Sequence, residues 1–272
     1  MHRTKIEWTE FVWNPLTGCL GPRGDGVRCP YCYANKLAQE RLFASYLSNM
    51  NIIAGNADDP FAPRFWPNRL EEPLHIKKPS KIFVCDMGEL FGDWIPEGIV
   101  KAVLEIIKDC PWHTFQLLTK QPQNLAKFSP FLDNVYVGVS VTNQHQYNEA
   151  LKYLKNIQAK VKFLSIEPLL EHIPEINLKG LDWIIIGGKS GDDPFYPPLK
   201  WIVDIEDAAK EAGIPVFEKF NLVPHPNPKF LRQEFPASLL ASSNLDPRLR
   251  QNAKERRKAR YEYATLKENK RI

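Results

Sequence analysis

No stretch of this sequence approaches the ~20 consecutive apolar residues that a membrane-spanning helix requires. The first residues, MHRTKIEWTEF, also lack the apolar segment of a secretory signal. The chain has only five cysteines, and this odd number argues against a framework of disulfide bonds. We therefore expect a cytoplasmic protein with free thiols and no membrane partner.

Several chemical signatures are missing as well. The six histidines form no His-x-His or His-Glu-x-x-His pair, so we assign no histidine to catalysis. The segment GGKSG at 187–191 lacks the spacing of a P-loop and of the dinucleotide-binding fingerprint. The paired motifs of zinc deaminases are absent, because Arg28 rather than proline precedes Cys29.

Charge is distributed unevenly along the chain. Residues 248–272 hold ten Lys or Arg and three Glu, a net charge of +7, so the overall charge of +4 leaves −3 for residues 1–247. We expect one domain over residues 1–240 and a basic, helical or disordered tail over residues 241–272. The charge of the tail has two possible explanations. The tail could be a solvated segment without a binding role, or it could bind nucleic acid weakly and without sequence preference, with Tyr261 and Tyr263 stacking on bases.

Apolar runs alternate with helical patterns. Strands are predicted near the N-terminus and at 81–86, 113–120, 135–141, 162–170, 182–191 and 214–220. Helices are predicted directly after Tyr33 and at 96–110, 121–128, 143–157 and 199–213, with Asn143 as an N-cap and Gly213 as a helix stop. This alternation predicts an α/β protein whose parallel sheet is covered by helices and is either open or closed into a barrel.

Polar or glycine-rich residues follow nearly every predicted strand. They include 86–89, 119–120, 140–143, 165–167, 187–191 and 218–219. Ligand sites of parallel sheets form at the carboxyl ends of the strands, so we expect these residues to surround one site. For Lys219, binding of an anionic substrate and a solvated surface position are both open.

Three cysteines lie within fourteen residues: Cys19, Cys29 and Cys32. Four thiolates would complete a structural zinc or iron–sulfur site, whereas three leave one metal position open. We favour an iron–sulfur cluster. A zinc site remains the main alternative, with a fourth ligand among His2, His75, His113, Cys85 and Asp86, and unliganded thiols are a third.

The Cys-Pro-Tyr-Cys end of this motif resembles the cluster loop of radical S-adenosylmethionine (SAM) enzymes, Cys-x3-Cys-x-aromatic-Cys. Here nine residues rather than three separate Cys19 from Cys29. The resemblance implies a [4Fe-4S] cluster on Cys19, Cys29 and Cys32, with SAM on the fourth iron. It also implies an incomplete, TIM-like (βα)6-7 barrel of parallel strands, with the cluster loop near the N-terminus.

The same resemblance implies a set of SAM-binding residues. Gly88 and Glu89 look like the Gly-Glu element that binds the SAM amino group, and Tyr31 would lie against the adenine. At two further strand ends, Ser140 offers a hydroxyl suited to the ribose or the SAM carboxylate, and Glu167 is a candidate for the SAM ribose or the substrate. Lys189 would lie next to SAM or donate to the substrate.

The chain is also similar to a phage-associated family of largely unknown function. The similarity is carried by Trp13 to Cys19, Cys29 to Ala34, Glu89 to Phe91, Ser165 to Leu169 and Gly187 to Gly191, over residues 4–222. Lys189 replaces an acidic residue of that pattern, and Arg28 replaces a glycine. The segment Cys29-Pro30-Tyr31-Cys32-Tyr33 also resembles part of spore photoproduct lyase, a radical SAM enzyme of DNA repair.

These observations lead to two functional hypotheses. The first is a radical SAM enzyme that forms a 5′-deoxyadenosyl radical, acts on an unknown substrate such as a nucleic acid or nucleotide, and is reduced by a flavodoxin or ferredoxin. The second is a nucleic-acid-binding or repair-associated module in which zinc or an iron–sulfur cluster is only structural.

Overall fold

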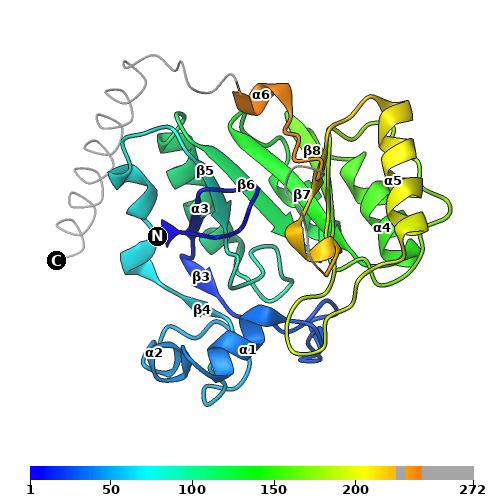
Figure 1. Cartoon of the computed structure of the whole chain (residues 1–272). Coiled ribbons are helices and arrows are strands. Elements are labelled where there is room, and N and C mark those ends of the chain that lie inside the picture. Colours follow the sequence, from blue (N-terminus) through cyan, green and yellow to red (C-terminus); the bar gives the residue numbers. More distant parts are fainter. Residues whose placement is uncertain (225–230, 241–272) are drawn as a thin grey trace, which may run out of the picture.

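An eight-stranded, mostly parallel sheet forms the centre of the molecule (Figure 1). The computed structural model describes residues 1–224 and 231–240. In spatial order the strands are β1 (His2–Arg3), β2 (Phe11–Trp13), β5 (Lys81–Val84), β6 (Thr114–Thr119), β7 (Val135–Val141), β8 (Val161–Ile166), β9 (Trp183–Ile186) and β10 (Val216–Glu218). Strand β1 is antiparallel to β2, and all other neighbours are parallel. The predicted α/β class is confirmed.

The helices fall into two groups. Three longer helices, α3 (Glu97–Asp109), α4 (Gln144–Leu154) and α5 (Leu199–Ala212), follow strands of the sheet. The short helices α1 (Tyr33–Gln39) and α2 (Phe43–Leu47) lie together at one end of the molecule (Figure 1). Two short strands that lie between β2 and β5 in the sequence, β3 (Leu16–Thr17) and β4 (Arg64–Phe65), form a separate antiparallel pair. A last short helix is α6 (Ala237–Leu240).

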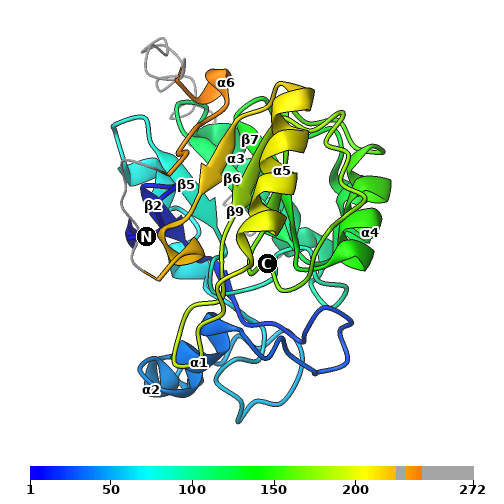
Figure 2. The ribbon, with the colours of Figure 1, turned by 45° about the vertical axis from the view of Figure 1, so that its right-hand side comes forward.

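One face of the sheet packs against α3, α4 and α5 (Figure 2). Successive side chains of a strand point to opposite faces. In β5, Ile82 and Val84 therefore join the core beneath these helices, whereas Phe83 belongs to the core on the other face. The apolar side of each helix supplies the rest, for example Val103 and Ile107 of α3, which are fully buried.

The other face of the sheet holds an aromatic cluster around Trp8. This residue lies in the turn between β1 and β2, and its ring centroid is 4.7 Å from that of Phe83 and 6.3 Å from that of Trp183. In the same turn, Glu7 accepts a hydrogen bond of 3.0 Å from the backbone N–H of Phe220, just beyond β10. The turn between β1 and β2, at one edge of the sheet, thus contacts the residues that follow β10 at the other edge.

Gly138 in β7 is required by this aromatic packing. A Cβ atom at this position would lie 2.3 Å from the ring of Phe163. Phe163 is fully buried in the aromatic cluster and has no space to move aside. Glycine occurs inside strands where another group approaches the backbone closely, and here the Phe163 ring occupies the space that a side chain at position 138 would need.

The predicted order of strands and helices is confirmed, with differences in detail. Asn143 caps α4 by accepting a hydrogen bond from the Gln146 N–H, and Gly213 ends α5 in the left-handed conformation. Residues Pro122–Phe128 form a 3-10 helix, and the described residues between β8 and β9 contain no helix. Among the described residues β1 and β10 are not paired, so the predicted barrel is not confirmed.

Two further sequence predictions concern membrane-spanning helices and the basic tail. Within residues 1–224 and 231–240, no helix combines the length and apolar character needed to cross a bilayer. The basic tail at 241–272 lies outside the described residues, and its predicted nucleic-acid binding therefore stays a prediction.

Candidate functional site

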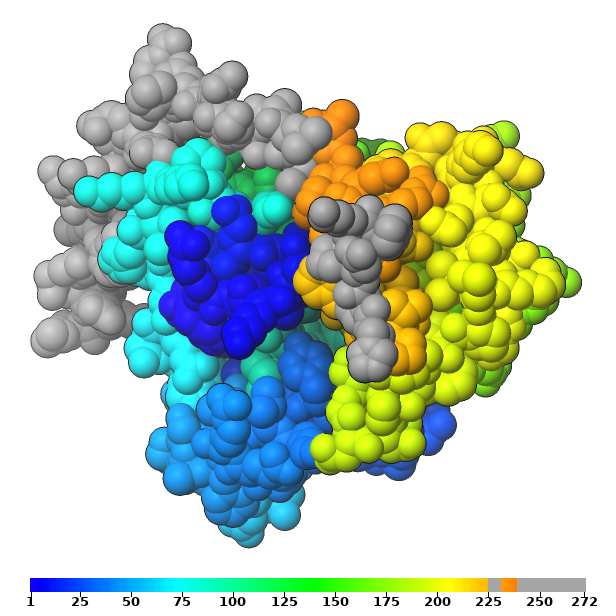
Figure 3. Space-filling view, viewed as in Figure 1, coloured from blue at the N-terminus to red at the C-terminus, as the bar shows by residue number. Residues whose placement is uncertain are grey.

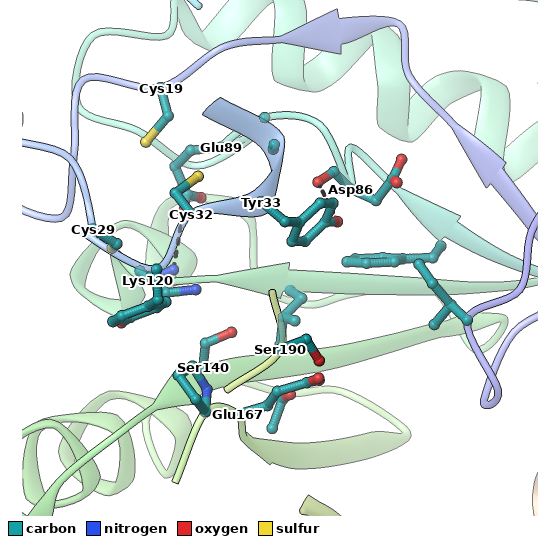
Figure 4. A pocket seen from close by; sticks show the side chains of 18 of the residues that line it. Cys19, Cys29, Cys32, Tyr33, Asp86, Glu89, Lys120, Ser140, Glu167 and Ser190 are labelled. Carbon is teal, nitrogen blue, oxygen red and sulfur yellow. Dashed lines mark hydrogen bonds between the residues drawn. The ribbon is translucent and has the colours of Figure 1, made fainter. Parts of the chain in front are cut away.

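The three cysteines lie on the segment that connects β3 to α1. Cys32 is the N-cap of α1, where its Sγ accepts a hydrogen bond of 3.3 Å from the backbone N–H of Asn35. The Sγ of Cys19 accepts one of 3.2 Å from the N–H of Gly21. All three thiols, including that of Cys29, are free and partly buried. In Figure 4 the sulfur atoms of Cys19 and Cys32 point toward the same space.

These thiols line a cavity of 520 Å³, called the site cavity below. The carboxyl ends of the parallel strands open into it, as expected for this architecture (Figure 4). Its wall contains every residue that the sequence assigned to the iron–sulfur cluster or to SAM: Cys19, Cys29, Cys32, Tyr31, Gly88, Glu89, Ser140, Glu167 and Lys189. The structure therefore brings all nine residues together, while their roles stay predictions.

The environment of the thiols favours their protonated form. Burial, followed by the neighbouring Glu89 carboxylate, raises the pKa of Cys19 to about 12. Burial also raises the pKa of Cys32, and the nearby Lys120 ammonium opposes this rise. For Tyr31, burial and then Cys29 raise the pKa of the hydroxyl. A bound cation would offset the cost of ionising these groups, and its binding would release protons.

Arg28, which stands where the phage-associated pattern has glycine, holds the cysteine segment together. Its Nε donates a hydrogen bond of 3.1 Å to the carbonyl of Cys19, and one Nη donates to Asn35 at the start of α1 over 3.0 Å. The guanidinium also forms an ion pair with Asp59 and lies over the ring of Phe61, 5.1 Å from its centroid. Arg28 therefore fixes the positions of both ends of the cysteine segment.

Glu89 is a buried carboxylate at the boundary between the site cavity and the core. It accepts hydrogen bonds from the Thr119 hydroxyl at 2.6 Å, the Lys120 N–H at 2.9 Å and the Phe91 N–H at 3.1 Å. Burial raises the pKa of Glu89, and these donors oppose the rise. The side chain thus connects the loop after β5 with the end of β6, and its remaining lone pairs are available to an ammonium group.

Gly88 allows two loops to approach each other closely. It forms a parallel bridge with Gly18, the residue before Cys19. The Gly18 N–H donates to the carbonyl of Met87 over 2.8 Å. A Cβ atom on Gly88 would lie 3.1 Å from the backbone of Thr17, tighter than ordinary van der Waals contact. The close packing of these two backbones places the first cysteine beside the end of β5.

Lys219 is a largely buried lysine that lines the site cavity and has acidic partners, so it is not a solvated surface residue; its binding of an anionic substrate stays a prediction. Its ammonium forms ion pairs with Glu167, after β8, and with Glu7 of the N-terminal turn, the latter at 3.8 Å. Asn221 donates to the carbonyl of Gly188 over 2.9 Å, beside the same carboxylate. Pairing satisfies a lysine that would otherwise be costly to bury. Lys219 therefore orients Glu167 at the wall of the site cavity.

The segment after β9 folds back over the site cavity. Lys189 forms a backbone bridge with Phe195 and an ion pair of 2.5 Å with Asp193. At the tip of this segment, Asp192 forms an ion pair with Lys36 of α1. Figure 3 shows these two parts of the chain side by side on the surface, although 156 positions separate the paired residues.

Two serines form a small polar patch on the wall of the site cavity. Ser140 of β7 and Ser165 of β8 are direct partners in the sheet register, so their side chains share one face. Both line the site cavity, and their exposed fractions are only 5% and 1%. Two hydroxyl groups side by side can donate to and accept from a polar ligand.

Sequence reasoning missed some of the polar groups at the site. The side chain of Lys120 lies in the site cavity close to Cys32 and Glu89. Asp86 also lines it, where Asn14 donates to its carboxylate over 2.6 Å and burial raises the pKa of Asp86. Both residues belong to predicted strand ends, and Asp86 was also a candidate zinc ligand, but neither was assigned to the cluster or to SAM.

Among the described residues, no group of three or more His, Cys, Asp or Glu side chains is arranged to hold a metal ion. A single zinc ion with ligands at about 2.3 Å would need such a group. The three thiols all line the site cavity.

The comparisons with known proteins give a family but no activity. A family model described as "Protein of unknown function (DUF5131)" matches residues 3–224. Comparisons with curated proteins and with solved structures gave no match.

Proposed function

The chain belongs to the DUF5131 family of proteins of unknown function, and we propose from its cysteine motif and its site that it is a radical SAM-type iron–sulfur enzyme. The observation that carries this proposal is the shared cavity: three free thiols and the polar ends of the parallel strands face the same 520 Å³. This volume lies within the range of small-molecule sites.

Cys19, Cys29 and Cys32 would hold a [4Fe-4S] cluster. When bound and reduced, such a cluster supplies the electron that cleaves SAM into methionine and a 5′-deoxyadenosyl radical, which abstracts a hydrogen atom from the substrate. The donor set fits this group because three thiols leave one coordination position free. The backbone N–H groups of Gly21 and Asn35, which already donate to two of the sulfur atoms, would stabilise thiolates.

The number of cysteines in the motif favours a cluster over zinc. A structural zinc site takes four ligands, whereas a cluster held by three thiolates keeps one iron open for SAM. Cys110 is a buried core thiol, and Cys85 packs into the core as well as lining the site cavity, so neither is one of the three proposed ligands.

The strand ends supply the groups that SAM needs. The ammonium group requires acceptors, which the carbonyl of Gly88 and the carboxylate of Glu89 provide. Ser140 offers a hydroxyl to the ribose or the carboxylate, and Glu167 is held toward the site cavity by Lys219. We further propose that the parallel sheet corresponds to an incomplete (βα) barrel. Its two edges would be bridged by the turn between β1 and β2, where Glu7 pairs with Lys219 after β10.

SAM binding tests this proposal, and Ser140→Val is the informative variant. Valine keeps the strand but puts an apolar branch into the site cavity, so the Kd for SAM should rise about tenfold, or 1.4 kcal/mol. The control is Thr114→Val. Thr114 is the first residue of the neighbouring strand β6 and does not line the site cavity, so this similar change should leave the Kd for SAM unchanged.

Binding should be measured by equilibrium dialysis on protein reconstituted with iron and sulfide without oxygen, and on cluster-free protein. We expect tight binding only to the reconstituted protein. Equal affinity for SAM in the two forms, or no binding to either, would contradict the proposal. One zinc per chain in protein purified without oxygen, with no SAM binding, would favour a structural metal instead.

A further inference from the structure

A second cavity, of 620 Å³, lies on the side of the cysteine segment that faces α4. We call it the outer cavity. It is bounded by the segment from Pro22 to Tyr31 and by His145 and Glu149 of α4. It shares five lining residues with the site cavity: Arg28, Cys29, Tyr31, Lys120 and Ser140. Cys29 can therefore be approached from two directions.

The nine residues between Cys19 and Cys29, called the insert below, form a defined loop beside this cavity. The Gly26 N–H donates to the carbonyl of Leu20 over 2.8 Å, and the Val27 N–H donates to the Asp25 carboxylate over 3.0 Å. Gln121, after β6, donates to the carbonyl of Pro22 over 3.1 Å and so fastens the insert to the sheet. A loop with these internal bonds presents a preformed surface.

That surface combines an apolar centre with cationic groups. Val27 is 60% exposed, which is unusual for a valine, and Pro30 beside Cys29 is exposed as well. Three cations line the outer cavity, Arg23, Arg28 and Lys120, against one carboxylate, Glu149. Apolar centres with charged rims are typical of protein interfaces, and the sign of the rim selects the partner.

The excess of cations is modest, because two of the three have acidic partners. Arg23 is paired with Asp25 over 2.8 Å, and Arg28 is paired with Asp59. Lys120 forms no ion pair among the described residues. Such a surface suits a weak, transient partner with an acidic face rather than a permanent complex.

We propose that the outer cavity and the insert form the docking surface for an acidic, low-potential one-electron carrier protein. This inference rests on the proposed function, because that reaction consumes one electron for each SAM cleaved. The carrier loses one electron, the iron–sulfur group held by the three cysteines gains it, and no bond forms or breaks in this step.

The geometry favours the outer cavity over the site cavity for this task. The site cavity must hold SAM and the reacting part of the substrate, and α1 and the segment around Asp192 narrow its approach. The outer cavity leads to Cys29 without passing through that space. A carrier seated there would approach a cluster ligand directly, whereas a nucleic-acid substrate must reach the site cavity.

Carrier binding by the full chain tests the proposal without any turnover. Oxidised flavodoxin, an acidic protein, is titrated into the chain in low salt and again in 0.2 M salt. We expect the Kd to rise with salt, because charges on a rim are screened. In Arg23→Glu/Val27→Asp the Kd should rise about tenfold, as expected for a reversed rim charge and a lost apolar contact. The control Lys108→Glu on α3 should change it less than about twofold.

A second readout separates this inference from the proposed function. With reduced flavodoxin as donor, formation of 5′-deoxyadenosine by Arg23→Glu/Val27→Asp should fall about tenfold, in parallel with binding. With dithionite, a small reductant, the same variant should match the unchanged chain. No product with dithionite in the unchanged chain would refute the proposed function, whatever the carrier does.

Three outcomes would overturn the docking surface itself. One is flavodoxin binding that the double substitution leaves unchanged, and another is the absence of flavodoxin binding to the unchanged chain. The third is a double variant that loses affinity for single-stranded DNA while it keeps its affinity for flavodoxin. That last result would mark this surface as a nucleic-acid interface.

Discussion

Replacing Cys19, Cys29 or Cys32 singly with alanine is expected to abolish the iron content of the reconstituted protein. The unchanged chain should bind about four irons with a visible charge-transfer band, because a [4Fe-4S] cluster is held by cysteine thiolates. Each variant leaves two of the three proposed ligands, too few to retain the cluster. The fourth thiol on the wall of the site cavity, Cys85, is only 4% exposed and packs into the core. Iron and sulfide are measured per chain after anaerobic reconstitution.

Two controls separate loss of a ligand from loss of the fold. Cys110→Ala removes a thiol from the core and should keep the iron, although it destabilises the fold. Cys32→Ser should keep the N-cap of α1, which alanine would lose at a cost of about 1 kcal/mol. We therefore expect Cys32→Ser to fold normally and still fail to load iron. Normal iron content in all three alanine variants would refute the cluster assignment.

Arg64→Met is expected to lower the free energy of unfolding by about 3–5 kcal/mol, the range for breaking a buried, charged network. Arg64 of β4 is fully buried, and its guanidinium donates to five backbone carbonyls. These belong to Asn49, Ala57, Asp59, Pro60 and Ala62, at distances of 2.7–3.2 Å. Methionine fills part of the space but leaves these acceptors without a donor.

The damage should reach the cysteines, because the segment held by Arg64 supports them. The carbonyl of Phe61 accepts a hydrogen bond of 3.1 Å from the Cys19 N–H, and Asp59 pairs with Arg28. Denaturant unfolding measures the effect, with Arg41→Met as the exposed control, expected within about 0.5 kcal/mol of the unchanged chain. A loss below about 1 kcal/mol for Arg64→Met would mean that water replaces the arginine at little cost.

The sequence predicted the strands better than their partners. A run such as 135–141 is apolar except for Ser140 because both faces of a central strand are buried, and β7 spans these same residues. The predicted strand at 162–170 ends four residues earlier, at Ile166, because the residues after it turn toward the site cavity. The role of Trp8 was not visible, because its contacts lie with Phe83 and Trp183, far along the chain.

The same limit applies to the site. Parallel strands bring their carboxyl ends to one edge, so Glu89, Ser140 and Glu167 could be expected together. The pairing of Glu89 with Thr119 and of Glu167 with Lys219 depends on loop conformations after each strand, which no local pattern encodes. The long connection around Arg64 gave no periodic signal at all, although it supports the cysteine segment.

The production of 5′-deoxyadenosine tests the central claim most directly. Reconstituted protein is incubated with SAM and dithionite without oxygen, and the nucleoside is quantified by chromatography with mass detection. We predict that the unchanged chain forms 5′-deoxyadenosine and methionine, and that Cys32→Ser forms neither. A fully iron-loaded protein that binds SAM yet leaves it intact under these conditions would contradict the account.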